Sequence, residues 1–237
     1  MNKSIIVITM GHPAVIGSEI AVKALNNKSL YKDAIPLIIG DIEVIKDAVN
    51  FIPSNLKLNK VKKTEQAKGK YGTIDVLNLN NISLDEFKYG EVNPKAGKAS
   101  IEYIITGIDL ALENKVQAVV TGPIHKEAIN QAGFKYAGHT ELFAERTKTK
   151  DYAMMLADKE MRVIHVSTHV SLKEAIERVK KDRIYKVIKL AHNAMLNLGI
   201  DEPKIAVAGL NPHAGEQGLF GTEEIEEITP AIEKALR

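Results

Sequence analysis

The alternation of short β-branched runs with longer helical stretches is the feature that most restricts the fold of this chain. Most of the runs are apolar nearly throughout, as expected for strands that helices cover on both faces. The predicted strands are Ser4–Thr9, Ile35–Gly40, Ile74–Asn78, Gln117–Thr121, Tyr152–Leu156, Arg162–Ser167 and Lys204–Leu210. The predicted helices are Glu19–Leu25, Glu43–Val49, Pro94–Glu113, Glu141–Arg146, Leu172–Leu198 and Glu223–Ala235. This order predicts an α/β fold with an open, mainly parallel sheet.

Two of the predicted helices carry clear start signals. Asn93 can cap the helix that Pro94 begins, because proline is favoured at the first helical position. Ser171 and Glu174 have the spacing of a capping box, in which each side chain accepts a hydrogen bond from the backbone of the other. We therefore expect helices to begin at these two places.

Composition excludes several classes of site. The chain has 237 residues, a net charge of +2, no Trp and no Cys. The near-neutral charge gives no global field toward nucleic acid or an anionic membrane, and sparse aromatics argue against base-stacking platforms. The absence of Cys excludes disulfides, thiolate zinc sites and cysteine nucleophiles. Any metal site must therefore use His, Asp or Glu.

No segment predicts a membrane or nucleic-acid surface. The apolar run Ile5–Ile8 is too short for a signal-peptide core, and no segment reaches the length of a membrane span, so we expect a soluble, cytoplasmic protein. The basic stretch Lys57–Lys70 has no interleaved aromatic residue. We expect a solvated loop or an edge strand there, where lysines discourage aggregation.

Three histidines open polar turns that follow apolar runs: His139, His169 and His213. The ends of parallel strands gather along one edge of a sheet, where α/β proteins place their chemistry. His169 and His213 could together bind a divalent metal, but two ligands hold a metal poorly; Glu216 is a candidate third ligand, or part of a simple turn. Thr140 is a plausible helix cap that places His139 just outside a helix N-terminus, where anions bind, although a surface histidine fits equally well.

Two glycine-containing turns directly follow predicted strands. Gly11 and Gly17 could hold a phosphate on backbone N–H groups. Their spacing matches neither a P-loop nor a dinucleotide fingerprint, which favours a tight turn with Ser18 as helix cap. Lys126, in the other turn, could bind a carboxylate or phosphate, or be a solvated lysine.

Several of these motifs occur together, in the same order, in one known family. They are Thr121-Gly122-Pro123-Ile124-His125-Lys126, Gly138-His139-Thr140-Glu141, Ser167-Thr168-His169, Gly209-Leu210-Asn211-Pro212-His213-Ala214-Gly215-Glu216 and Gly221-Thr222-Glu223-Glu224. With them, essentially the whole chain resembles the 4-hydroxythreonine-4-phosphate dehydrogenase (PdxA) family of pyridoxal phosphate biosynthesis. Asp151-Tyr152-Ala153-Met154 and the segment Arg162–His169 are closer to the branch that oxidises D-threonate or D-erythronate 4-phosphate.

The resemblance implies a two-domain αβα sandwich of the isocitrate/isopropylmalate dehydrogenase-like fold, incomplete at its C-terminus, that acts as a homodimer. It implies that His139 and Thr140 bind the phosphorylated substrate and that His169 and His213 ligate a divalent metal (Zn, Mg, Co or Mn). The implied reaction is oxidation of a phosphorylated hydroxy acid by NAD or NADP, followed by decarboxylation of the resulting 3-oxo acid. The resemblance leaves the cofactor-binding and catalytic residues of this chain unassigned.

The chain departs from the family pattern in its first loop and in its extent. The family loop Gly-Asp-Pro-Ala-Gly-Ile-Gly is Gly11-His12-Pro13-Ala14-Val15-Ile16-Gly17 here, so an imidazole replaces a carboxylate and Val15 replaces a glycine. The family also continues past the position of Arg237, with a His-Asp-Gln-Gly motif that supplies a third metal ligand. We therefore expect residues 1–237 to be one incomplete dehydrogenase unit of two interleaved subdomains that binds metal weakly and turns over slowly or not at all.

Two other functions stay open on the sequence alone. A phosphate-handling acyltransferase could share a related two-domain α/β architecture, since fold does not decide function. The other alternative is an inactive fragment that keeps a dimer surface. The histidine pair favours the dehydrogenase, because acyl transfer to phosphate needs no metal.

Overall fold

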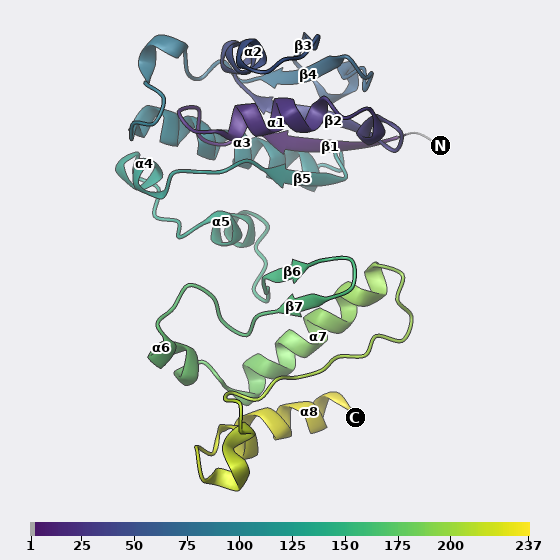
Figure 1. Cartoon of the computed structure of the whole chain (residues 1–237), viewed down its shortest axis with the longest axis vertical. Coiled ribbons are helices and arrows are strands. Elements are labelled where there is room, and N and C mark those ends of the chain that lie inside the picture. The colour runs from purple at the N-terminus through teal and green to yellow at the C-terminus, as the bar shows by residue number, and fades with distance from the viewer. Residues whose placement is uncertain (1–2) are drawn as a thin grey trace. The chain divides into compact units, whose positions relative to one another are not determined.

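The computed structural model describes residues 3–237, and the chain forms two compact units, Met1–Lys148 (unit 1) and Thr149–Arg237 (unit 2) (Figure 1). Unit 1 contains a five-stranded parallel sheet in the order β3-β4-β2-β1-β5. Its strands are β1 (Ser4–Thr9), β2 (Ala34–Gly40), β3 (Lys57–Val61), β4 (Thr73–Asn78) and β5 (Ala118–Thr121). The predicted parallel α/β fold is confirmed.

Helices cover both faces of this sheet. They are α1 (Gly17–Leu25), α2 (Ile42–Phe51), α3 (Pro94–Leu112), α4 (Lys126–Gln131) and α5 (His139–Arg146). The crossovers through α1 and α2 step in one direction along the sheet, and the crossover through α3 steps back. Right-handed connections therefore place α3 on the opposite face from α1 and α2. The result is a three-layer αβα unit.

The core of unit 1 lies between these layers. Fully buried apolar side chains from the strands, such as Val7 and Ile38, pack with α1, α2 and α3. A second cluster joins Ile104 of α3 to Ile129 of α4 and Leu142 of α5. Because this second cluster connects α5 to α3, the start of α5 is held by packing rather than by a loop alone.

One polar pair is built into the core beside β2. The Tyr103 hydroxyl donates to Asp41 Oδ2 at 2.6 Å, and the Asn81 N–H donates to Asp41 Oδ1 at 3.1 Å. Burial raises the pKa of the Asp41 carboxyl, and it also raises the pKa of Tyr103, to which the Asp41 charge adds. Burying a carboxylate without hydrogen-bond partners would destabilise the fold by several kcal/mol, so these hydrogen bonds allow Asp41 to be buried.

The predicted elements of unit 1 agree closely with the structure. The four predicted strands in this part of the chain are β1, β2, β4 and β5. The Lys57–Lys70 stretch contains β3, which pairs only with β4 and is an edge strand, as expected. Asn93 caps α3 by accepting from the Ala96 N–H at 2.9 Å. The prediction that Ser18 caps α1 is wrong, because Ser18 is the second helical residue and Ile16 precedes the helix.

Unit 2 is helical around a small antiparallel hairpin. The hairpin is β6 (Met155–Ala157) and β7 (Arg162–Ile164). The helices are α6 (Leu172–Glu177), α7 (Lys181–Asn197) and α8 (Thr229–Ala235), with a 3-10 turn at Ala214–Gly218 and a π-helical turn at Glu224–Ile228. Ile184 of α7 packs against Ile228 and Ala231 in the core of this unit.

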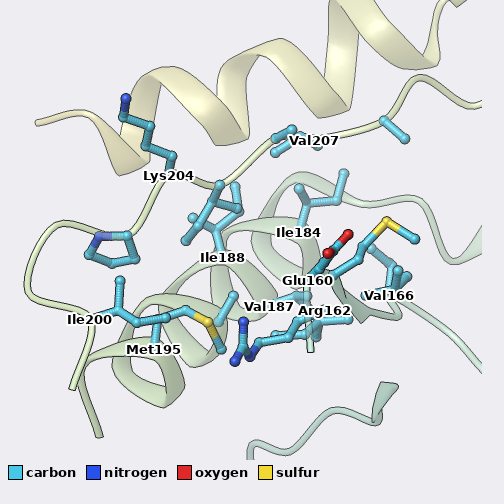
Figure 2. Close-up of a pocket in the computed structure, with 18 residues that line it drawn as sticks. Glu160, Arg162, Val166, Ile184, Val187, Ile188, Met195, Ile200, Lys204 and Val207 are labelled. Atoms are coloured by element: carbon cyan, nitrogen blue, oxygen red, sulfur yellow. The ribbon is translucent and has the colours of Figure 1, made fainter. Parts of the chain in front are cut away.

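Four predicted elements of unit 2 are corrected. The predicted strand Lys204–Leu210 pairs with no other strand in the described chain; together with β7 and α7 it lines a cavity of about 630 Å³ (Figure 2). The predicted helix Leu172–Leu198 is two helices. It divides because the Glu227 carboxylate accepts from the Lys181 N–H at 2.6 Å and from the Lys180 side chain, which starts α7 afresh. The predicted strands Tyr152–Leu156 and Arg162–Ser167 are each reduced to three residues.

No helix among residues 3–237 is both long enough and apolar enough to cross a membrane. The longest described helix, α3, is the buried crossover of the sheet, with its apolar side chains packed in unit 1.

Candidate functional site at the carboxyl edge of the parallel sheet

The turns after β1 and β5 meet at the carboxyl edge of the unit 1 sheet. These strands are neighbours, with Thr9 opposite Thr121 at their ends. The Gly122 N–H donates to the Thr9 carbonyl at 2.9 Å, and the His12 N–H donates to the Pro123 carbonyl at 2.8 Å. The two turns are therefore tied to each other by main-chain hydrogen bonds.

Glycine allows this close approach. A Cβ atom on Gly11, whose φ is +80°, would lie 2.4 Å from the Pro123 carbonyl oxygen, and a Cβ on Gly17 would lie 2.2 Å from the Met10 carbonyl oxygen. The space next to both glycines is filled by the chain's own backbone. The first loop is thus a tight strand–helix turn in which both glycines are needed for the close approach of the backbone.

His12 is a neutral imidazole inside this turn. It is 0% exposed, and its Nδ1 accepts from the Ala14 N–H at 3.2 Å, which places the ring proton on Nε2. Burial lowers the pKa of His12, and the neighbouring His125 lowers it further. The Asn93 backbone is close enough to oppose that shift, but Nε2 makes no well-formed hydrogen bond with any described residue.

His125 belongs to the turn after β5 and lies against His12. Its ring centroid is 5.8 Å from that of His12, with 52° between the ring planes. His125 Nδ1 accepts from the Ala128 N–H at 3.3 Å, so the imidazole caps α4 in place of the usual Ser, Thr, Asp or Asn side chain. Lys126, the first residue of α4, is exposed.

His139 and Thr140 lie at the start of α5. The extended residue Gly138 precedes the helix, so His139 is its first residue. The prediction that Thr140 caps this helix is therefore wrong, and so is the placement of His139 just outside it. Burial lowers the pKa of His139, and the adjacent Gly122 backbone opposes that shift. His139 Nε2 is buried and has no hydrogen-bond partner within residues 3–237.

Three imidazoles thus converge on one short backbone segment. The rings of His12 and His125 lie against each other, the His12 backbone N–H bonds the Pro123 carbonyl, and His139 lies next to Gly122. Sequence reasoning found His139 but did not include His12 and His125 in the site. The signal available was their position, since each lies in the turn directly after one of two strands that are neighbours in the sheet.

The predicted metal pair, His169 and His213, lies in unit 2, and both side chains are exposed. His213 Nδ1 lies 2.8 Å from Glu216 Oε1, and its ring is 5.4 Å from that of Phe220. Within the described chain, no group of three His, Asp or Glu side chains is placed to hold a metal ion. The metal site therefore stays a prediction, and the unit 2 residues do not by themselves form a complete donor set.

The unit 2 cavity is chemically different from the histidine cluster. Its wall is mainly apolar and includes Val187 and Ile188 of α7 and Val207, with Glu160 and Arg162 at the hairpin (Figure 2). No histidine lines it. We do not assign the reaction to this cavity.

Comparison with known proteins identifies the family. The family described as pyridoxal phosphate biosynthetic protein PdxA matches residues 32–237, which is more than half of the chain. The chain belongs to the PdxA family. The resemblance that the histidine motifs carried in the sequence is thereby confirmed.

Curated relatives in this family are similar to the chain over almost its whole length. A protein of Oceanobacillus iheyensis with the provisional name D-threonate 4-phosphate dehydrogenase is 45% identical over 238 aligned positions, covering 100% of this chain and 71% of that protein. A Clostridium botulinum protein with the same provisional name is 45% identical over 234 positions, covering 99% of this chain and 70% of its own length.

Solved structures of the family share the fold. A 4-hydroxythreonine-4-phosphate dehydrogenase from Burkholderia phymatum superposes with a TM-score of 0.87 at 37% identity, covering 100% of this chain and 72% of that one. The enzyme of the same name from Klebsiella pneumoniae gives a TM-score of 0.90 at 38% identity, covering 98% of this chain and 70% of that one. The chain thus spans about seven-tenths of these relatives.

Proposed function

We propose that this protein is a dehydrogenase that oxidises a phosphorylated hydroxy acid with NAD or NADP. The candidate substrates are 4-phosphohydroxy-L-threonine, D-threonate 4-phosphate and D-erythronate 4-phosphate, and the resulting 3-oxo acid is then decarboxylated. The observation that carries the proposal is membership in the PdxA family, with relatives named for such dehydrogenases at 45% and 37–38% identity. The D-threonate 4-phosphate reaction is the first to test, since the 45% identical relatives carry that name.

The geometry supports a phosphate-binding role for His139 and Thr140. Both lie in the first turn of α5, where unpaired backbone N–H groups and the helix dipole favour an anion. His139 Nε2 has no hydrogen-bond partner in the described chain, but it is buried, so the first turn of α5 would have to shift for a phosphate to reach this atom. The site lies at the carboxyl ends of β1 and β5, which is where open α/β sheets bind their ligands.

The proposed reaction balances in two steps. Oxidation moves the hydride from the carbinol carbon to the nicotinamide and the hydroxyl proton to a base or water, leaving a 3-oxo acid. Decarboxylation then breaks the bond to the carboxylate carbon, releases CO₂ and leaves an enolate that takes up a proton. His139 and Thr140 would fix the phosphate end, so that the reacting carbon is held in one position.

The residues of this chain give less support to cofactor binding and metal binding than to phosphate binding. NAD or NADP would supply the hydride acceptor. No residue of this chain is assigned to the cofactor. His169 and His213 would give a divalent metal two imidazoles, fewer than the three protein ligands of a stable catalytic site, so we assign no step to a metal.

A homodimer is also part of the proposal, on the family resemblance alone. It can be checked by sedimentation or light scattering of the purified chain. A monomer at every accessible concentration would contradict this part without affecting the proposed phosphate site.

The proposal is tested by mixing the purified chain with each candidate substrate, NAD or NADP and a divalent metal, and following NADH absorbance. Calorimetric binding of D-threonate 4-phosphate is the second readout. His139→Asn should weaken that binding about 10- to 100-fold, the usual effect of losing one hydrogen bond to a charged group. His192→Asn, on an exposed histidine of α7, is the matched control.

Two results would contradict the proposal. One is the absence of both NADH formation and binding for all three substrates. The other is equal binding by wild type and His139→Asn, which would remove His139 from the phosphate site.

A further inference from the structure

Among the described residues, the titratable side chain next to the His12 ring is the imidazole of His125. His12 is fully buried, and its side chain bonds only to the Ala14 N–H within the described chain. Its closest aromatic contact is the His125 ring at 5.8 Å. Two imidazolium ions at this separation would repel each other in a site from which water is largely excluded.

Local hydrogen bonds fix the same tautomer in both rings. In each ring Nδ1 is an acceptor, from Ala14 for His12 and from Ala128 for His125. A proton on Nδ1 would face a backbone N–H and break that bond. While the two turns keep this conformation, the singly protonated form of each ring carries its proton on Nε2.

We propose that His12 is a positioning residue for His125, and that the two form a neutral imidazole pair which keeps the edge next to His139 free of imidazolium charge. The buried His12 ring lies beside the partly exposed His125 ring, with 5.8 Å between the ring centroids, and supports it from the interior, while the backbone N–H of residue 12 bonds the Pro123 carbonyl. His125 can then act at this edge as an uncharged Nε2–H donor, and any positive charge there comes from Lys126. Only the role of this edge rests on the proposed function; the charge state of the pair does not.

The surrounding elements supply no carboxylate bond to the pair. Glu19 lies in the first turn of α1, and Lys95 at the start of α3 is paired with Glu86. Lys126 is exposed on α4, and His139 on α5 contacts Gly122. None of these groups forms a hydrogen bond with either imidazole in the described chain.

The test is imidazole nitrogen NMR of the full chain near pH 7, without substrate. We expect both His12 and His125 to show the neutral tautomer protonated on Nε2. In His12→Asp a carboxylate faces His125, so the doubly protonated fraction of His125 should rise about tenfold or more relative to His12→Asn. His12→Asn is the matched control because its Oδ1 can still accept from the Ala14 N–H while adding no charge.

A second variant covers the case in which His12→Asp does not fold. His125→Asn keeps a good cap for α4 and removes the neighbouring imidazole, so His12 should take up its proton at a higher pH than in the wild type. The proposal is overturned if either wild-type ring carries its proton on Nδ1 or is charged at pH 7. It is also overturned if His12→Asp leaves the protonation of His125 unchanged, or if His125→Asn leaves the titration of His12 unchanged. None of these readouts depends on substrate turnover.

Discussion

His12 is buried in the folded chain and solvated in the unfolded chain, so its protonation is linked to folding. Burial holds its pKa below the ordinary value of 6.5. Between that lowered pKa and 6.5 the unfolded chain binds more protons than the folded chain, so stability rises with pH in this window. As the pH falls below 6.5 through this window, the folded protein loses the stability that it gains from keeping His12 neutral.

This linkage gives a direct prediction for His12→Asn. Asparagine does not titrate, so the variant should lose less stability than the wild type on going from about pH 7.5 to about pH 5.5. One proton sets the ceiling on the difference, about 1.4 kcal/mol per pH unit. Denaturant unfolding at both pH values measures it. Equal acid sensitivity of the two proteins would show that His12 is not the buried neutral group that the structure describes.

The sequence was sufficient to predict single motifs, but not which of their residues lie close together in the folded chain. His139 was found from its position after a glycine in a polar turn. His12 and His125 were not joined to it, because their proximity depends on β1 and β5 being neighbours, which no local pattern encodes. The cap predicted at Thr140 failed for a related reason: the extended Gly138 takes the position before the helix, and one residue decides which side chain can reach the free N–H groups.

Helical glycines show how elements are fitted to one another. Gly17 in α1 and Gly107 in α3 both have ordinary helical φ, but a Cβ on Gly17 would lie 2.2 Å from a backbone oxygen of Met10. A Cβ on Gly107 would approach a methyl group of Val119 at 3.1 Å, and a side chain can move where a backbone cannot. Alanine substitution at the two positions therefore distinguishes the effect of helix propensity from the effect of packing.

We predict opposite outcomes for alanine at these two glycines. Gly17→Ala should destabilise the protein by about 1–3 kcal/mol, because overpacking outweighs the gain in helix propensity. Gly107→Ala should change stability by less than about 1 kcal/mol, since the propensity gain offsets a small side-chain shift. Thermal and denaturant unfolding of both variants provide the measurement. Comparable losses at both positions would mean that the Met10 contact does not determine the need for Gly17.

Element prediction worked where the local pattern and the tertiary structure agree. Apolar runs covered on both faces, such as Ile35–Gly40, are strands in the parallel sheet. Lys204–Leu210 has the same pattern, but it lies across a cavity from β7, so it has no strand to pair with in the described chain. The division between α6 and α7 was also out of reach, because the carboxylate that starts α7 belongs to Glu227, far along the sequence.

The two units of the molecule differ in the size of the apolar core and of the sheet that each contains. The main apolar cluster, around the parallel sheet, is made of residues before Lys148. Unit 2 has a smaller cluster, strands of three residues each and a cavity of about 630 Å³. A two-stranded sheet is marginal by itself, so the packing of α7 and α8 has to supply most of the stability of unit 2.

This difference predicts that residues 1–148 fold as an isolated fragment, whereas residues 149–237 do not. The first fragment keeps the complete five-stranded sheet, with α3 covering one face and α1 and α2 the other. It should show dispersed NMR signals and one cooperative unfolding transition. The second fragment should keep some helix signal but bind an apolar dye and unfold without a sharp transition, because its apolar cavity is not filled. A 149–237 fragment with cooperative unfolding and no dye binding would show that the cavity is compatible with a stable core, and a 1–148 fragment without dispersed signals would show that the sheet needs unit 2 to fold.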